Sequence, residues 1–372
     1  MAWLVALGAI LALAFSTALT GLARRLSLAV GFTDDPGHRK IHAQPMPLGG
    51  GAAIFLSVWI PVLACAAVAL YGFPAWLAPP GSMLARFHAD WIAIHVPGFA
   101  SRMPEMWLLL GASAAILAIG LVDDRFHLTA RAKFVCVLAV AAALASSAEG
   151  FRSSLFLPEI PARILTILWI VGITNAMNLL DNMDGLSAGV AAIAAGFFLS
   201  VALQREQWFL AIFLGILLLS ALGFLAWNFP PARIFMGDAG SLFLGFCLAV
   251  ASIRLTYVPE GDTHALFPVV VPMLILAVPI YDTASVLWIR FRKGTPLFRG
   301  DMNHFSHRLL ALGLSPREAL LVIYLLAFFV GLSALTIYRS TPAESAVLLL
   351  QGFGVLAIIA LLERAGRRKK EA

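Results

Sequence analysis

Two neighbouring aspartates close an apolar run in the segment GLVDDRFHLTARAK, where they could hold a metal ion or contact a phosphate. Consecutive residues on a helix point about 100° apart, so Asp123 and Asp124 cannot both aim at one ligand while the helix continues. We therefore expect one carboxylate to face a shared metal or phosphate and the other to support it. Capping of a helix end is the alternative role for such a pair.

Four amide and carboxylate side chains recur every three residues in the segment TNAMNLLDNMDGL, namely Asn175, Asn178, Asp181 and Asp184. On a regular helix these steps spread the four groups over about half of the circumference, so they could not share one ligand. Gly185 and the clustered Asn and Asp residues indicate that the helix breaks here and that a loop wraps around a site. Such polar groups are costly just inside a membrane helix unless they have a function.

Asp238 lies in NFPPARIFMGDAGS, between Gly237 and Gly240 and directly before another apolar run. Glycines let the backbone come close to a phosphate, and the start of the following helix offers N–H donors to an anion. An aspartate here can hold Mg²⁺ that bridges the same phosphates, although a simple turn between helices would use similar residues. The chain has no G-x-x-x-x-G-K-[ST] and no G-x-G-x-x-G motif, so a nucleotide would be bound in another way.

Basic and imidazole side chains supply candidate phosphate contacts. Arg39, Lys40 and His42 in DDPGHRKIHAQPMPLGGG suit a phosphate at a membrane surface, where a solvated basic loop is the alternative. His304 and His307 in RGDMNHFSHRLLALG are three residues apart and therefore share one helix face. Two histidines and an aspartate could bind zinc, but the closed ligand set is missing, which favours contact with phosphate or metal-linked pyrophosphate.

The elements that hold these residues must be membrane helices. Of the 372 residues, 61% are hydrophobic and only 12% are charged, which is about half the charge of a soluble domain. The mean hydropathy is +0.91. This composition excludes a disordered chain, a DNA-binding domain and an ordinary cytosolic enzyme. A β-barrel would need alternating strands of about ten residues, and the apolar runs are too long and uniform for that.

We therefore predict an all-α, polytopic membrane bundle that forms a single domain over residues 1–372. The apolar runs of spanning or near-spanning length number eleven, at about 2–23, 48–71, 107–122, 134–148, 163–180, 186–203, 208–227, 241–257, 266–289, 319–338 and 344–362. Asp282, in VPIYDTAS, lies about two turns inside the ninth run. An intramembrane carboxylate normally faces a cavity or a partner, so Asp282 is a further site candidate.

The order of charges predicts the topology. The first run lacks a basic segment before it and is followed by Arg24 and Arg25, which places the N-terminus in the periplasm. In that orientation the C-terminus is cytoplasmic. The cytoplasmic segments, which are residues 24–47, 123–133, 181–185, 228–240, 290–318 and 363–372, hold 19 of 26 Lys and Arg, eight of eleven Asp and five of eight His. An active site is therefore expected on the cytoplasmic face, built from residues 24–47, 123–133, 175–186, 228–241 and 290–318.

These five segments, in this order, resemble the motifs of glycosyltransferase family 4, the polyprenyl-phosphate N-acetylhexosamine-1-phosphate transferases, in its WecA/TagO-like branch. The resemblance covers nearly the whole chain. DDPGHRKIHAQPMPLGG is similar to D-x-P-x-x-R-K-x-H-x-x-x-x-P-x-x-G-G, and NAMNLLDNMDGL to N-x-x-N-x-x-D-G-x-D-G-L. PARIFMGDAGSLFLG is close to the most specific run of the family, and HFSHRL resembles its HIHH segment. Asn182 stands where the pattern has glycine, and Ser306 where it has histidine, which argues against the MraY branch.

The resemblance implies transfer of a sugar phosphate in the plane of a bacterial inner membrane. Undecaprenyl phosphate would attack the β-phosphorus of a UDP-N-acetylhexosamine, with UDP-N-acetylglucosamine as the expected donor, and UMP would leave. This step initiates cell-envelope polysaccharide synthesis. The implied cofactor is Mg²⁺, or Mn²⁺ in its place, with Asp238 and Asp181 as ligands. The implied catalytic residues are Asp123, Asp124, Asp181, Asp184, His304 and His307. The implied substrate-binding residues are Arg39, Lys40, His42, Asn175, Asn178, Gly237 and Asp282.

Two alternatives stay open on the sequence. An MraY-type phospho-MurNAc-pentapeptide transferase would use the same chemistry within the same family. A transporter, which is a different class, would place polar groups at the membrane midplane and interrupted helices in paired repeats. Here the carboxylates lie mostly at helix ends on one face. The expected partners are the two substrates and the lipid bilayer, with no nucleic acid, and a homodimer is left open.

The predicted topology can be tested with fusions to a reporter that is active only in the periplasm. The reporter should be inactive after Ala372, because the basic tail RAGRRKKEA is held in the cytoplasm, and active within the 72–106 loop. A C-terminal fusion with full periplasmic activity would contradict the orientation.

Overall fold

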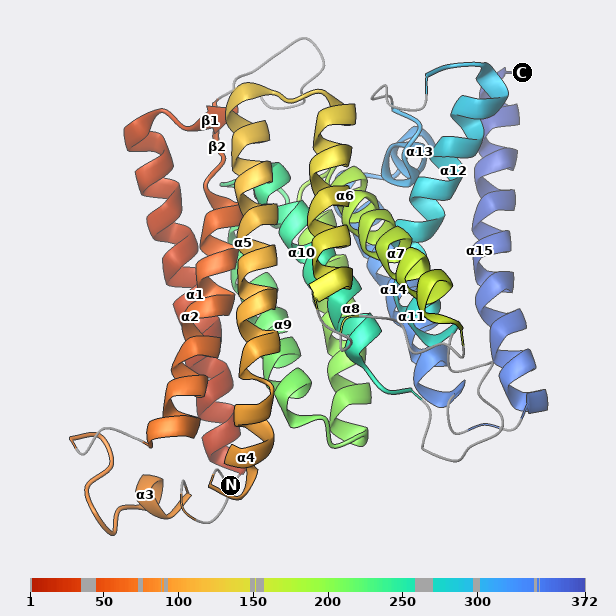
Figure 1. Ribbon diagram of the computed structural model, residues 1–372. Coiled ribbons are helices and arrows are strands. Elements are labelled where there is room, and N and C mark those ends of the chain that lie inside the picture. Colours follow the sequence, from red (N-terminus) through yellow and green to blue (C-terminus); the bar gives the residue numbers. More distant parts are fainter. Residues whose placement is uncertain are drawn as a thin grey trace.

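The computed structural model describes residues 2–34, 45–72, 76–87, 89, 93–147, 151, 157–257, 270–296, 302–337, 340 and 342–371 (Figure 1). The long helices are α1 (Ala2–Val30), α2 (Gly50–Tyr71), α5 (Met103–Phe126), α6 (Ala130–Ser147), α7 (Glu159–Leu180), α8 (Leu186–Gln204), α9 (Trp208–Asn228), α10 (Gly237–Arg254), α12 (Ala277–Lys293), α14 (Pro316–Ile337) and α15 (Pro342–Glu371). The short elements are α3 (Met83–Phe87), α4 (Ala93–Ser101), α11 (Val271–Ile275), α13 (Phe305–Ala311), β1 (Thr33–Asp34) and β2 (Met46–Pro47). The predicted all-α fold is confirmed.

Nine helices of the described chain are long and apolar enough to cross a membrane, namely α1, α2, α5, α6, α7, α8, α9, α10 and α14. The ninth predicted run is divided at Leu276 into α11 and α12. Because α12 ends in Arg290, Arg292 and Lys293, it is less apolar than its neighbours. The eleventh predicted run corresponds to the apolar part of α15, at Ala343–Val355.

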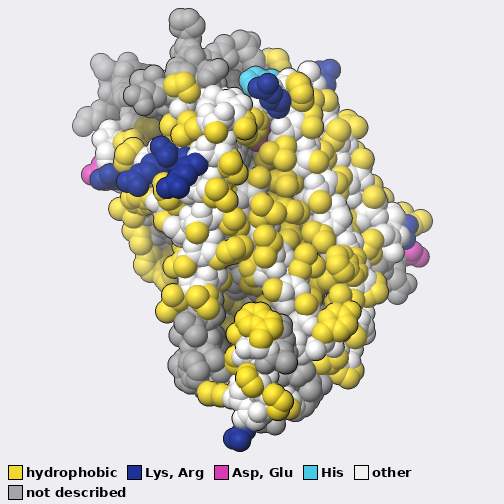
Figure 2. Space-filling view, turned by 90° about the vertical axis from the view of Figure 1, so that its left-hand side faces the viewer, with side chains coloured by type: hydrophobic (Ala, Val, Ile, Leu, Met, Phe, Trp, Pro, Cys, Tyr) yellow, Lys and Arg dark blue, Asp and Glu magenta, His cyan; other side chains and the backbone are white. Residues whose placement is uncertain are grey.

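The outer surface of the bundle is apolar. Large hydrophobic side chains remain exposed on several helices, including Leu26 on α1, Ile60 on α2, Leu168 on α7 and Phe329 on α14. Figure 2 shows apolar side chains across the middle of one face, with Lys and Arg gathered mainly toward its upper part. Lipid tails are as apolar as these side chains, so their exposure fits a protein that is surrounded by a bilayer. The chain is a multi-pass membrane protein.

Helix α10 forms the centre of the bundle. Of the residues in the most apolar stretch of α10, 78% are buried inside the protein, compared with 11% for α1. It packs against α5 and α7, and also against α2 and α8. Glycines permit the closest of these approaches: a Cβ added at Gly120 of α5 would lie 2.3 Å from the Cα of Ala239, and one at Gly51 of α2 would lie 2.4 Å from the backbone nitrogen of Gly240. The first turn of α10 is therefore fixed by direct backbone contact with two other helices.

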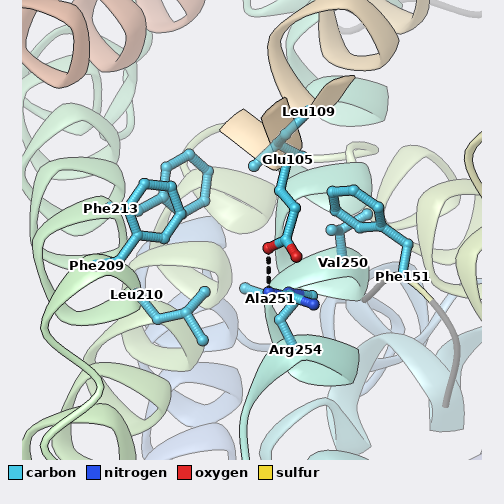
Figure 3. A pocket seen from close by; sticks show the side chains of 9 residues that line it. All are labelled: Glu105, Leu109, Phe151, Phe209, Leu210, Phe213, Val250, Ala251 and Arg254. Atoms are coloured by element: carbon cyan, nitrogen blue, oxygen red, sulfur yellow. Dashed lines mark hydrogen bonds and ion pairs between the residues drawn. The ribbon is translucent and has the colours of Figure 1, made fainter. Parts of the chain in front are cut away.

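A partly buried ion pair joins α5 and α10 at their other ends (Figure 3). Glu105 of α5 pairs with Arg254 of α10, whose guanidinium also lies 5.4 Å from the centre of the Phe151 ring. Leu109 and Phe213 are among the apolar side chains around the pair. Glu105 also pairs with Arg102 of the preceding turn, at 3.1 Å. We interpret the Glu105–Arg254 pair as a contact that helps to fix the register of α5 against α10.

The two ends of the chain lie at opposite ends of the bundle. Figure 1 shows α1 starting at the end marked N, while α15 finishes at the end marked C, where β1, β2 and α13 also lie. An odd number of membrane crossings produces this arrangement. The assignment of the C-terminal end to the cytoplasm stays a prediction.

The close approach at Gly120 generates a stability prediction. Gly120→Ala should lower the free energy of unfolding by about 1–3 kcal/mol, because the new methyl group would collide with the backbone of α10. Gly111→Ala is the matched control, since it lies on the same helix and its Cβ would meet no atom within 4 Å. Thermal unfolding in detergent measures both variants. Equal melting temperatures would show that α5 and α10 can separate freely at this point.

Candidate active site

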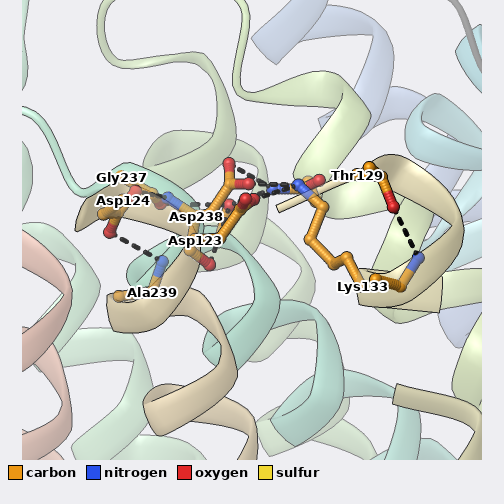
Figure 4. A network of polar contacts seen from close by, with 10 residues as sticks. Asp123, Asp124, Thr129, Lys133, Gly237, Asp238 and Ala239 are labelled. Carbon is orange, nitrogen blue, oxygen red and sulfur yellow. Dashed lines mark hydrogen bonds and ion pairs between the residues drawn. The ribbon is translucent and has the colours of Figure 1, made fainter. Parts of the chain in front are cut away.

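Three charged side chains meet at the start of α10 (Figure 4). The Lys133 ammonium, from the first turn of α6, donates to Asp123 Oδ2 at 2.7 Å and also to Asp238 Oδ2. The Asp238 side chain is 31% exposed, whereas those of Asp123 and Lys133 are 9% and 14% exposed. Two carboxylates from different helices therefore converge on one cation at a site that is only partly open. This brings together two of the predicted residues, Asp123 and Asp238.

Asp124 makes different contacts from its neighbour. Its Oδ1 accepts from the backbone N–H of Asp238 at 2.7 Å, and its Oδ2 accepts from the N–H of Ala239 at 3.2 Å. These are unpaired donors of the first turn of α10, so Asp124 caps that helix from another helix. Gly237 has a φ of +66°, and a Cβ there would lie 2.4 Å from Asp124 Oδ2. The cap therefore requires glycine at position 237 for both conformation and space.

Asn178 joins the same cluster from α7. Its Nδ2 donates to Asp238 Oδ1 at 2.8 Å and to Ser241 Oγ at 2.9 Å. Asn175, one turn earlier, donates instead to the carbonyl of Val171 in its own helix at 2.8 Å. The two asparagines therefore differ in their partners, although three residues separate them on one side of α7. Of the two asparagines, only Asn178 contacts Asp238.

The loop after α7 carries Asp181 and Asp184. The helix ends at Leu180 and α8 starts after Gly185, whose φ is +76°, so the predicted break is present. Asp184 Oδ2 accepts from the N–H of Ala232 at 2.9 Å, which ties this loop to the segment before α10.

The backbone N–H of Asp181 donates to the carbonyl of Asn178 at 3.3 Å, whereas its carboxylate accepts no hydrogen bond from the residues that the structure describes. Burial raises the pKa of its carboxyl well above the usual range, and the nearby carboxylates of Asp238, Asp124 and Asp184 raise it further. The loop therefore presents an acidic group that a cation would stabilise in its charged form.

The histidine segment is anchored by Asp282, which is fully buried in α12. Asp282 Oδ2 lies 2.8 Å from His304 Nδ1, and Oδ1 accepts from the N–H of Phe305 at 2.5 Å. The centres of the His304 and His307 rings are 6.3 Å apart. Both oxygens of Asp282 are thus engaged within the protein, which makes it a support for His304 rather than an open substrate contact.

Arg39, Lys40 and His42, the predicted phosphate contacts of the first loop, lie outside the described residues. The residues that flank this loop are near the site: Asp34 pairs with Met46 in the two-stranded sheet, and the N–H of Phe235 donates to the carbonyl of Pro47 at 2.9 Å. Phe235 precedes Gly237 by two residues. The two-stranded sheet that flanks the first loop is therefore hydrogen-bonded to the segment just before α10.

Lys133 was not among the predicted site residues. Its position within TARAK looked like part of a basic cytoplasmic loop. One signal was available, because a lysine in the first turn of a helix opposes the helix dipole and needs a compensating partner. Lys133 finds that partner in the carboxylates of Asp123 and Asp238.

The donor set is suitable for Mg²⁺. Hard carboxylate oxygens of Asp123 and Asp238 already converge on a cation, the Lys133 ammonium, with Asp181 nearby. Within the described parts of the chain, no group of three or more His, Cys, Asp or Glu is arranged to hold a metal by itself. Mg²⁺ commonly takes one or two protein carboxylates and completes its shell with phosphate oxygens and water, so two carboxylates are enough.

Comparison with known proteins identifies the relatives. Residues 106–256 match the model of glycosyl transferase family 4. The chain is 34% identical to the probable undecaprenyl-phosphate N-acetylglucosaminyl 1-phosphate transferase of Bacillus subtilis, over 87% of this chain and 82% of that protein. It is 32% identical to the decaprenyl-phosphate N-acetylglucosaminephosphotransferase of Mycobacterium tuberculosis, over 93% of this chain and 86% of that protein. It is 25% identical to the undecaprenyl-phosphate α-N-acetylglucosaminyl 1-phosphate transferase of Yersinia pestis, over 84% of this chain and 79% of that protein.

The helical membrane bundle, together with the match to a glycosyl transferase family, defines the class as a membrane-embedded transferase. Within that class, the chain belongs to glycosyl transferase family 4, in its WecA/TagO-like branch, and is a phosphoglycosyl transferase. The family resemblance predicted from the motifs is confirmed, and it decides against a transporter.

The anchoring of the histidine segment predicts a graded loss of stability at Asp282. Asp282→Ala should lower the free energy of unfolding by about 1–3 kcal/mol, because it leaves the buried N–H of Phe305 without its acceptor. Asp282→Asn should cost less, since its amide oxygen can still accept from Phe305. Thermal unfolding of both variants in detergent is the measurement. If Asp282→Ala has the same melting temperature as the wild type, Asp282 is not the anchor of the histidine segment.

Proposed function

We propose that this enzyme transfers N-acetylglucosamine 1-phosphate from UDP-N-acetylglucosamine to undecaprenyl phosphate at the cytoplasmic face of a bacterial inner membrane. The relatives named for undecaprenyl-phosphate or decaprenyl-phosphate N-acetylglucosamine-phosphate transfer support the acceptor and the sugar. The product would be undecaprenyl-diphosphate N-acetylglucosamine, which begins the assembly of a cell-envelope polysaccharide.

The observation that carries this proposal is the convergence of Asp123, Asp238 and Lys133 at the head of α10. A diphosphate donor and a phosphate acceptor together bring several negative charges, so their reaction requires compensating positive charge. The ammonium of Lys133 provides one such charge. The carboxylates of Asp123 and Asp238 hold it at the site, where it could donate a hydrogen bond to a phosphate oxygen. The site lies at helix ends, where an acceptor embedded in lipid can meet a donor from water.

The reaction that fits this site is a displacement at phosphorus. An oxygen of the lipid phosphate forms a bond to the β-phosphorus of the donor, and the bond from that phosphorus to the bridging oxygen breaks. The electron pair stays on the bridging oxygen, which leaves as part of UMP. The protein contributes mainly by positioning and by charge stabilisation, since phosphoryl transfer needs little covalent help.

The metal would be held by Asp238 together with Asp123 or Asp181. When bound, Mg²⁺ would neutralise the diphosphate and stabilise the charge that develops on the leaving UMP. Asn178 would keep the Asp238 carboxylate oriented through its amide hydrogen bond. His304 and His307 would contact phosphate oxygens, while Asp124 would hold the α10 backbone in place.

The decisive experiment is UMP release by purified protein in detergent, with undecaprenyl phosphate, Mg²⁺ and a panel of UDP-sugars that includes UDP-MurNAc-pentapeptide. Release with UDP-N-acetylglucosamine supports the proposal. Release only with the pentapeptide donor would favour the MraY-type alternative, and no release with any donor would refute the transferase assignment of this site.

Charge removal at the site gives a sharper prediction. Asp238→Asn and Lys133→Met should each lower kcat at least a hundredfold, about 2.7 kcal/mol of transition-state stabilisation, because each removes a charge from the centre. Glu159→Gln is the matched control, as it removes an exposed carboxylate from the opposite end of α7. Measured turnover near the wild-type value for Asp238→Asn would make Asp181 the better metal ligand.

A further inference from the structure

One hydrogen bond links two segments that the sequence presents as separate motifs. The hydroxyl of Ser306, in α13, donates to Asn182 Oδ1, in the loop between α7 and α8, across 124 residues of sequence. Ser306 is 1% exposed, so its hydroxyl depends on a protein partner. The amide of Asn182 is fixed in turn, because its Nδ2 donates to the carbonyl of Leu179 at 2.8 Å.

The two partners lie within the candidate catalytic segments. Asn182 directly follows Asp181 and precedes Asp184 by two residues. Ser306 lies between His304 and His307. A bond between Asn182 and Ser306 therefore joins the acidic loop, residues 181–185, to the histidine helix, α13.

Further contacts fasten the C-terminal part of the chain to the same loop region. The Tyr324 hydroxyl of α14 donates to the carbonyl of Gly185 at 2.6 Å, and Arg317 Nε donates to the carbonyl of Pro230 at 3.1 Å. Helix α13 packs against α14, so the two helices approach the acidic loop together. Among these contacts, the Asn182–Ser306 bond is the one that joins the acidic loop to the helix bearing the histidines.

Asn182 and Ser306 are also the two positions at which this chain departs from the family pattern. The pattern has glycine at the first position and histidine at the second. Glycine has no side-chain oxygen to accept from Ser306, so the bond requires the substitution at position 182. The two departures are therefore in direct contact with each other.

We propose that Asn182 and Ser306 act as a pair of positioning residues that hold His304 and His307 at a fixed distance from Asp181 and Asp184. The proposal rests on the proposed function, because the distance matters only if both groups act on one substrate complex. Loss of the bond lets α13 shift against the loop, which misplaces phosphate contacts without removing any of them.

The test is a double-mutant cycle with Asn182→Ala, Ser306→Ala and both together, assayed by UMP release. Ser306→Ala should lower kcat about tenfold and leave KM for the UDP-sugar within about twofold, and the double variant should lose no more than the single variant. Ser306→Thr should restore turnover because it keeps the hydroxyl. The buried hydroxyl control is Ser333→Ala, whose bond stays within its own helix at 3.3 Å, and its kcat should equal that of the wild type. Additive losses, or wild-type kcat for Ser306→Ala, would overturn the proposal.

A second arm replaces the pair by the residues of the family pattern. Asn182→Gly and Ser306→His should each impair turnover, and the double variant should recover activity beyond either single variant if the two positions act as a unit. A double variant no better than the worse single variant counts against the pair.

Hydrogen exchange separates failure of this proposal from failure of the proposed function. If the wild-type protein releases no UMP with any donor, the function falls. Ser306→Ala should nevertheless speed amide exchange in both 178–186 and 302–312, while Ser333→Ala should change neither segment. Unchanged exchange in either segment would refute the fastening role.

Discussion

The placement of two carboxylates and one ammonium at the ends of membrane helices is the constraint on which the site depends. Charges in such a setting are expensive to desolvate unless they are paired. Asp123 and Asp238 come from different helices and share the Lys133 ammonium of a third. The ends of α5, α6 and α10 must therefore meet at one point. Packing elsewhere in the bundle supports this arrangement, because Gly51 and Gly120 let the backbones of α2 and α5 approach the start of α10.

The adjacent Asp123 and Asp124 show how one helix end can provide both a site residue and a structural cap. Because consecutive side chains diverge on a helix, only one of them can turn toward Lys133 and Asp238. The other turns toward the first backbone N–H groups of α10 and satisfies them. Asp124 thus fills the capping role that was considered for the pair, while contact of Asp123 with a metal or phosphate stays a prediction. The cap also consumes donors that an anion could have used, so positive charge at the site must come from side chains or from a bound cation.

Local patterns predicted what depends on local physics. Long apolar runs predicted the spanning helices, and the glycine beside the aspartates at 184 and 238 predicted where the chain turns. The apolar runs ending near 122 and starting near 134 were predicted too short, because α5 and α6 continue through polar residues that face the site. Lys133 was missed for the same reason: its partners are remote in sequence, and its neighbours resemble an ordinary basic loop. Asp282 was noticed as an intramembrane carboxylate, but its partner His304 could only be found once α12 and α13 were placed together.

The histidine helix, α13, needs several anchors because it is short. Helix α13 has seven residues, too few to be stable by itself, so its position depends on the groups around it. Asp282 holds its start from the buried side through His304 and Phe305, and Asn182 holds Ser306 from the acidic loop. These contacts hold three consecutive residues, His304, Phe305 and Ser306, and so restrict the positions of the two imidazoles. Two kinds of contact therefore position this end of the bundle: close backbone packing fixes the start of α10, and side-chain hydrogen bonds hold α13.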